Sequence, residues 1–176
     1  MGVIYAILLI LALTTLIAWI SLAPWVPTKI EDLPRINRIA NLKPGQTFFE
    51  IGCGNGRVCT YIAKKNPNCK VIGIEYAIAF FLYTKFRNYL LGPKNLKIIF
   101  GDALKYKIRD VDVIYIFGLK QTVNGKIKKK LLKEMSSKSK FLSYVFSINS
   151  WPGYSKTYKK NEKTSGIHVY KISNNC

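Results

Sequence analysis

The chain opens on an unbroken apolar stretch and then alternates between short apolar runs and segments with a helical period. Residues 3–23 (VIYAILLILALTTLIAWISLA) contain no charged side chain, and this length is sufficient to cross a bilayer as one helix. Residues 29–42 place their apolar positions on one face of a helix. We therefore expect a transmembrane anchor at 1–23, a proline-containing linker at 24–28 and one folded domain at 29–176.

Beyond residue 42 the pattern predicts apolar strands separated by helical segments, followed by a final hairpin. The expected strands occupy parts of 47–52, 69–76, 96–104, 110–118 and 140–148, and two more flank a turn at 161–166. The expected helices lie at 56–65, 77–91 and 126–137. Strands that alternate with helices favour a parallel sheet with crossover helices. The expected fold class is α/β: a Rossmann-like, doubly wound, seven-stranded sheet with a terminal antiparallel hairpin, preceded by one N-terminal transmembrane helix.

Charge is concentrated after the apolar opening. The chain has 28 Lys and Arg against 9 Asp and Glu, for a formal net charge of +19, and Lys29 is its first charged residue. Because basic residues follow the apolar segment and none precedes it, the positive-inside rule puts the folded domain on the cytoplasmic side. The lack of a basic amphipathic leader favours a prokaryotic plasma membrane. A cleaved signal peptide is the main alternative, but its positive start and short apolar core are both missing.

Such a net charge favours an anionic partner: a nucleic acid, an acidic substrate or an anionic membrane surface. The run KIKKKLLK at 126–133 is strongly basic, and its lysines either rest on an anionic leaflet or form a solvated helix face. Four cysteines without a CxxC pair and a single histidine give no convincing metal-ligand set. Free thiols fit a reducing compartment.

The segment FFEIGCGNGR at 48–57 places three glycines directly after an apolar strand. Gly52, Gly54 and Gly56 allow the backbone to turn sharply and to approach a ligand with no side chain in between. The spacing is G-x-G-x-G, so the third glycine comes one residue too early for a dinucleotide fingerprint. In a doubly wound sheet, ligands bind at the carboxyl ends of such strands.

Three carboxylates lie at the ends of the first three expected strands. Glu50 ends the first strand and suits a ligand with a positive end. Glu75 ends the second, where an acid accepts bonds from both hydroxyls of a ribose. Asp102 follows the third and is placed to accept a bond from an adenine amino group. An adenosine joined to a cationic amino acid fits all three, so the expected cofactor is S-adenosylmethionine.

The segments EIGCGNGR, GIEY and GDAL, in this order, resemble the first motif and the second- and third-strand acids of the class I S-adenosylmethionine-dependent methyltransferases. The resemblance covers about residues 29–173 and implies the seven-stranded fold of that family. By this resemblance the expected cofactor-binding residues are Glu50, Gly52, Gly54 and Gly56 at the methionine end, Glu75 at the ribose and Asp102 at the adenine.

A narrower resemblance concerns the segment before the domain. An apolar span, then PWVPT, then EIGCGNGR and IYIFGL, is similar to the membrane-anchored protein-lysine methyltransferases. That family includes the mitochondrial enzymes that modify ATP synthase subunit c and the adenine nucleotide translocase. Its members tend to have proline where this chain has Lys120, after the fourth-strand FGL. The resemblance implies methyl transfer to a lysine of a membrane-associated protein.

Methyl transfer requires alignment more than an enzyme nucleophile, and no residue stands out as a general base. An apolar channel favours the neutral amine of a lysine, and the candidates for its wall are Trp151, after the fifth strand, and Tyr115, on the fourth. The alternatives are a lipid, quinone or other small-molecule methyltransferase, a nucleic-acid methyltransferase and a non-catalytic cofactor-binding scaffold. The segment FGLKQT lacks the Asn/Asp-Pro-Pro-aromatic motif of exocyclic-amine methylation, which disfavours nucleic acid.

Overall fold

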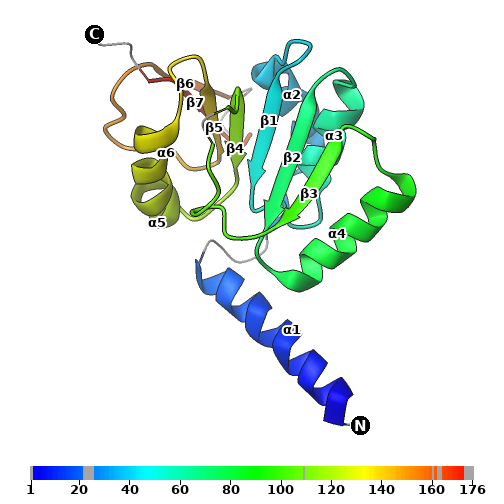
Figure 1. The fold of residues 1–176 in the computed structure, drawn as a ribbon. Helices are drawn as coiled ribbons and strands as arrows, with labels where there is room; N and C mark the ends of the chain where they lie inside the picture. The colour runs from blue at the N-terminus through cyan, green and yellow to red at the C-terminus, as the bar shows by residue number, and fades with distance from the viewer. Residues whose placement is uncertain (1, 22–25, 109, 160, 162–163, 173–176) are drawn as a thin grey trace.

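The computed structural model of the chain places a twisted sheet between two layers of helices (Figure 1). The N-terminal helix extends away on the side where the parallel strands end (Figure 1). The structure describes residues 2–21, 26–108, 110–159, 161 and 164–172, and the side chains of 11 and 15–21 lie outside that description. The helices are α1 (Gly2–Ser21), η1 (Ile30–Asp32), α2 (Leu33–Ala40), α3 (Arg57–Lys65), α4 (Ile78–Leu91), α5 (Lys120–Thr122), η2 (Val123–Ile127) and α6 (Lys128–Glu134). The strands are β1 (Thr47–Ile51), β2 (Lys70–Glu75), β3 (Leu96–Phe100), β4 (Val113–Ile116), β5 (Lys140–Tyr144), β6 (Ser155–Tyr158) and β7 (Ile167–Tyr170).

The seven strands form one sheet in the order β3-β2-β1-β4-β5-β7-β6. The first five are parallel to their neighbours, and β7 is antiparallel to both β5 and β6. The predicted Rossmann-like α/β class and the terminal antiparallel hairpin are confirmed. Because the strand order reverses between β1 and β4, the loops that follow these two strands diverge and leave a crevice at the sheet edge.

Alternation along β1 divides the core into two layers. Phe48 points to the side packed by α2 and α3, where it meets side chains such as Ile62. Phe49 points to the other side, where η2 and α6 supply residues such as Ile127 and Leu131. All of these side chains are fully buried, and each contributes about 1.5–3 kcal/mol of transfer free energy. Two apolar layers therefore fix the orientation of β1 and of the loop that follows it.

Helix α1 extends from the sheet edge at which the parallel strands end, and it contacts α4 (Figure 1). Its described apolar side chains are exposed, among them Val3, Ile4 and Leu9. Within the described residues, no helix combines the length and apolarity that crossing a membrane requires. Part of the predicted anchor falls outside that description, namely residues 1, 22 and 23 and the side chains of 11 and 15–21.

The helix predicted at 126–137 begins earlier and ends earlier. Helical structure starts at Lys120, passes through one π-helical segment and ends at Glu134. Asn124 and Gly125 are weak helix formers, so the sequence pattern gave no signal for these first turns. In the structure the Asn124 side chain donates to the carbonyls of Lys120 and Ser147, at 3.0 and 2.9 Å, which fastens this irregular start to the loop after β5.

Candidate active site

The loop between β1 and α3 is built from glycines in the left-handed region. The φ angles are 69° at Gly52, 51° at Gly54 and 70° at Gly56, a conformation that residues with a Cβ rarely adopt. The backbone N–H of Cys53 donates to the carbonyl of Ile74 at 3.0 Å, so the loop is fastened to β2. The result is a bare backbone surface at the carboxyl edge of the sheet, as the sequence predicted.

Glu75 holds this loop in shape. One carboxylate oxygen accepts the Gly54 N–H at 2.7 Å, and the other accepts those of Tyr76 and Ala77 at 2.9 and 2.8 Å. Burial raises the pKa of Glu75, and the three backbone donors oppose that shift. The residue predicted to bind the ribose is therefore also a structural part of the loop, and one acceptor position remains free, on the oxygen that accepts the Gly54 N–H.

Glu50 lies deeper, beneath the start of α3. Its Oε2 accepts the Cys59 N–H at 2.8 Å, and the side chain is buried. Burial, together with the nearby Cys59 thiol, raises the pKa of Glu50 well above its usual value of 4.5. Glu50 also lines a small cavity with Gly52 and Gly54. Within the described part of the chain, no basic side chain forms an ion pair with this carboxyl group, so it is available to a cation in the cavity.

Asp102 follows β3 at the same edge and is partly exposed. Its Oδ1 accepts the Leu104 N–H at 2.8 Å, which fixes the turn after the strand. The Gly101 N–H donates to the carbonyl of Glu75 at 3.0 Å and joins the ends of β2 and β3. All six predicted cofactor-binding residues therefore lie along one edge of the sheet.

The connector before the domain forms part of the same site. Val26, Pro27 and Thr28 line the small cavity beside Glu50. The Thr28 hydroxyl lies 2.8 Å from the Tyr115 hydroxyl. The backbone carbonyl of Thr28 accepts a hydrogen bond from the Arg57 guanidinium at 2.8 Å. Sequence reasoning assigned 24–28 to a linker and missed this role, because a proline-rich segment carries no periodic signal. Residues 24 and 25 lie outside the described part of the chain.

Helix α4 supplies a second contact that the sequence did not reveal. The hydroxyl of Thr84, a fully buried residue, donates to the carbonyl of Gly54 at 2.7 Å. A Cβ on Gly56 would meet the Thr84 methyl carbon at 2.5 Å, so this glycine is required for packing as well as for its φ angle. A single hydroxyl on an aromatic-rich helix gives no motif, and only the fold brings it to the loop.

Among the described side chains that line the small cavity, Phe117 is the aromatic one. It follows β4, lines the cavity beside Glu50 and packs edge-on against Tyr144, with ring centroids 4.9 Å apart. Tyr115, one of the two residues predicted for the acceptor wall, is fully buried and stacks on Phe48. Burial raises the pKa of the Tyr115 hydroxyl well above the usual range, and the Thr28 hydroxyl lies within hydrogen-bond distance of it.

Trp151, the other acceptor candidate, lies away from the carboxyl edge. Its indole N–H donates to the carbonyl of Lys171 at 2.9 Å, and its ring packs against Tyr170. Tyr170 pairs with Phe141 near the start of β5, so Trp151 lies beside the opposite end of that strand. The expected position over the carboxyl end is corrected: the chain after β5 runs back along the strand before β6 begins, and sequence distance does not show this return.

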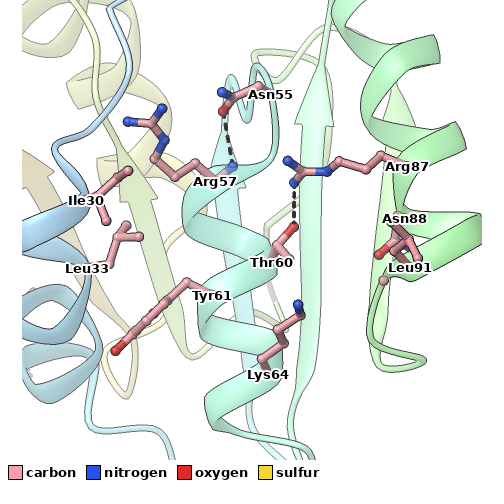
Figure 2. A pocket seen from close by; sticks show the side chains of 11 residues that line it. Ile30, Leu33, Asn55, Arg57, Thr60, Tyr61, Lys64, Arg87, Asn88 and Leu91 are labelled. Atoms are coloured by element: carbon pink, nitrogen blue, oxygen red, sulfur yellow. Dashed lines mark hydrogen bonds between the residues drawn. The ribbon is translucent and has the colours of Figure 1, made fainter.

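A second, larger hollow of about 440 Å³ runs along the outer side of α3 (Figure 2). Arg87 reaches across from α4 and donates to the Thr60 hydroxyl at 3.2 Å, so the two helices are bridged within it. Arg57 and Lys64 complete its cationic lining, and none of the described residues that line it is acidic. The hollow shares only Asn55 and Arg57 with the small cavity, so it is largely separate from the glycine loop.

The sheet order, the bare glycine loop at the switch point and the three edge carboxylates define an S-adenosylmethionine-dependent methyltransferase. The left-handed glycines leave a backbone surface without side chains, and Glu50 contributes a buried carboxyl group beside it. Residues 50–155 match the profile described as the ANTKMT methyltransferase domain, and the chain belongs to that family.

Individual relatives agree with this class. A protein-lysine N-methyltransferase of Saccharolobus islandicus (strain REY15A) is 28% identical over 137 residues, which are 76% of this chain and 83% of that protein. The (S)-tetrahydroprotoberberine N-methyltransferase of Eschscholzia californica is 38% identical over 76 residues, 43% of this chain and 21% of the relative. An RNA methyltransferase from Salinibacter ruber, solved with S-adenosyl-L-homocysteine, superposes with a TM-score of 0.75 at 19% identity, covering 86% of this chain and 96% of that one.

Proposed function

We propose that this methyltransferase transfers the methyl group of S-adenosylmethionine to a lysine side chain of a membrane-associated protein. The main support is the Saccharolobus islandicus relative, named a protein-lysine N-methyltransferase, which aligns with 76% of the chain. The ANTKMT methyltransferase domain family supports the same class of reaction. A likeness in fold to an RNA methyltransferase carries no substrate assignment, because only 19% of residues are identical.

The arrangement at the sheet edge suits a direct displacement. Bound S-adenosylmethionine supplies a methyl group on a sulfonium sulfur, which is already a good leaving group. The glycine loop and Glu75 fix the position of the cofactor, and Glu50 accepts its cationic end. The enzyme then has only to bring the amine nitrogen in line with the methyl carbon, about 3 Å away. The cofactor would supply the methyl carbon and the leaving sulfur, and the methylated amine would lose its proton to solvent.

Phe117 is the residue that we assign to the acceptor wall. Lysine must be neutral to attack, and its ordinary pKa is about 10.4. An apolar aromatic wall beside a bound cation disfavours a second charge and therefore lowers the pKa of the incoming amine. Phe117 lines the same cavity as Glu50, whereas the Tyr115 hydroxyl is engaged with Thr28. The apolar surface of Phe117 is therefore the feature of the described site that favours a neutral amine over a charged acceptor.

We also propose that α1 attaches the enzyme to a membrane, with the folded domain on the cytoplasmic side. The support comes from the sequence, where residues 1–28 carry no charge and basic residues follow. The described apolar side chains of α1 are exposed, and insertion into a membrane would cover them. The attachment places the methyltransferase near membrane proteins, in agreement with the substrate class.

The test uses the full chain, methyl-labelled S-adenosylmethionine and a membrane extract of the source cell. After the reaction, the label is separated into protein, organic-solvent and nucleic-acid fractions, and the protein is hydrolysed to amino acids. Label recovered as methyl-lysine is the expected result. Label in the organic phase would instead identify a lipid, quinone or small amine as acceptor. The second outcome has its own support, since the Eschscholzia californica relative is named for the methylation of a small molecule.

A further inference from the structure

Helix α4 turns an apolar face to the outside. We call it the α4 face, and its large side chains are between 52% and 85% exposed: Leu82, Tyr83, Phe86, Tyr89 and Leu90. Their spacing along the chain puts all of them on one side of the helix. A contiguous apolar surface of this kind marks an interaction site.

The opposite side of α4 is firmly held, so the helix presents this face from a fixed position. Thr84 donates to the carbonyl of Gly54 in the glycine loop, at 2.7 Å. Arg87 bridges to Thr60 of α3 at 3.2 Å (Figure 2). The α4 face is therefore carried on a helix that is joined directly to the cofactor loop.

Cations border the α4 face on both flanks. Lys85 lies over the Phe81 ring at 5.2 Å from its centroid, and Arg87 lies over the Tyr83 ring at 5.8 Å. Helix α4 contains no acidic residue. Beyond Arg87 lies the hollow along α3, which adds Lys64 and has no acidic side chain among its described lining residues (Figure 2). Apolar and aromatic residues with basic flanks are the composition of a helix that lies in the interface of an anionic bilayer.

The apolar surface continues from α4 onto α1. The two helices are in contact, and exposed apolar side chains of α1 such as Val3 and Ile4 lie on the helix that we propose as the membrane attachment. A partner that covers α1 is thus brought next to α4. Tyrosines such as Tyr83 and Tyr89 suit the boundary between headgroups and acyl chains, because one end of the side chain is polar.

We propose that the α4 face rests on an anionic bilayer, at the level of the headgroup–acyl boundary. This inference rests on the membrane attachment in the proposed function and adds the surface by which the folded domain contacts the bilayer. The parallel strands end on the side of the molecule from which α1 extends (Figure 1). The glycine loop would then be close to the lipid surface, and the lysines within reach would be those near the membrane interface of a substrate.

The lysine run at 126–133 is a weaker membrane contact than its charge suggests. Lys130 is buried and paired with Glu134 at 2.9 Å. Lys128 donates to the carbonyls of Asn149 and Ser150 at 2.8 and 3.0 Å. Only part of the run is therefore free to meet a phosphate, and α6 provides a matched control surface for α4.

The experiment places a fluorescent label on either surface of the full chain. Tyr89→Cys marks α4 and Lys129→Cys marks α6, both at exposed positions, in a Cys176→Ser background. The other cysteines, Cys53, Cys59 and Cys69, are buried. Protein-free vesicles are made of phosphatidylcholine with or without phosphatidylglycerol. Flotation measures attachment of the chain, and iodide quenching measures exposure of each label.

On vesicles with phosphatidylglycerol, iodide quenching of the Tyr89→Cys label should fall several-fold and its emission should shift to the blue. The Lys129→Cys label should remain accessible to iodide. An exposed Tyr89→Cys label on chains that float would overturn the α4 proposal and leave the attachment by α1 intact. Chains that do not float would overturn both. Protection of the label without vesicles, rising with protein concentration, would show a second copy on the face and would also refute the proposal.

A charge variant tests the anionic component separately. Lys85→Gln should increase iodide quenching at position 89 on vesicles with phosphatidylglycerol, because one flanking cation is lost. Lys126→Gln on α6 removes an equal charge and should leave that quenching unchanged. Equal effects of the two variants would mean that only net charge matters, and would contradict a defined α4 face.

Discussion

The two halves of the sheet's carboxyl edge are built in different ways. After β1 and β2, backbone groups define the site: three left-handed glycines and a carboxylate, Glu75, that accepts three N–H groups. After β4, the edge carries an aromatic side chain instead: Phe117 lines the small cavity and packs edge-on against Tyr144 of β5. A binding surface made of backbone groups keeps its shape when side chains are replaced. A surface made of aromatic side chains changes with each substitution. The difference explains why the cofactor was easier to predict than the substrate.

The largest effect should follow from Glu75→Ala. Three buried or partly buried N–H groups lose their acceptor, and an unsatisfied buried donor costs about 1–3 kcal/mol. We expect the free energy of unfolding to fall by about 3 kcal/mol or more and cofactor binding to be lost. Chemical denaturation and calorimetric titration with S-adenosylhomocysteine measure both. Glu31→Ala, at an exposed acid, is the control; equal behaviour of the two variants would refute the role of Glu75.

A smaller effect should separate two glycines that share a backbone conformation. Gly56 and Gly45 have φ angles of 70° and 84°, but an added Cβ meets Thr84 only at Gly56 and open space at Gly45. Gly45→Ala should cost about 1–2 kcal/mol for the left-handed conformation alone. Gly56→Ala should cost about 1–3 kcal/mol more, from overpacking, and should weaken cofactor binding. Equal destabilisation would mean that α4 does not support the loop.

Activity should respond differently to the two aromatic candidates of the acceptor half. Phe117→Ala should reduce kcat about 10–100-fold, because the amine is no longer aligned, with little change in cofactor affinity. Trp151→Ala should preserve most of the activity, since its ring lies beside the start of β5. Steady-state kinetics with the methylated substrate gives the comparison. A larger loss for Trp151→Ala would return this residue to the acceptor site.

The smallest effect should be a dependence of cofactor affinity on pH. Burial keeps the Glu50 carboxyl protonated above its usual pKa of 4.5 in the free protein, whereas a cationic ligand favours the carboxylate. Affinity should therefore rise with pH through the raised pKa, with release of a proton on binding. Glu50→Gln should flatten this dependence. Titration in buffers of different ionisation enthalpy counts the protons, and a flat wild-type profile would contradict the assignment.

The same pKa shift affects the stability of the cofactor-free protein. The unfolded carboxyl loses its proton near pH 4.5 and the folded one only at higher pH, so the folded state binds more protons in this window. The contribution of Glu50 to the free energy of unfolding must then fall as pH rises through that range. Glu50→Gln should remove this decline.

Sequence reasoning succeeded where chemistry is carried by consecutive residues. The glycine spacing, the strand-end acids and the alternation of strands and helices were each visible in short windows, and the parallel sheet with its terminal hairpin was predicted from that alternation. It failed where the chain returns on itself. The contact of Thr28 with Tyr115 spans 87 residues and that of Thr84 with Gly54 spans 30, and neither has a local signature.

The misplaced acceptor residue has the same origin. Trp151 follows β5 in the sequence, but the loop of 145–154 runs back to the start of that strand, where β6 begins opposite Tyr170. Residues with positive φ at Val145 and Ser150 mark the two bends of this return. Neither valine nor serine is a residue that signals a left-handed conformation, so the reversal could not be predicted.

Amide hydrogen exchange with and without S-adenosylhomocysteine tests the central claim most directly, because one experiment reports on the glycine loop, on the ends of β2 and β3 and on the segment around Trp151. Bound ligand should slow exchange in the loop of residues 52–59, at the amides that Glu75 holds and in the turn at Asp102. Exchange around Trp151 should not change. Protection confined to the segment around Trp151, or no protection at the glycine loop, would contradict the account.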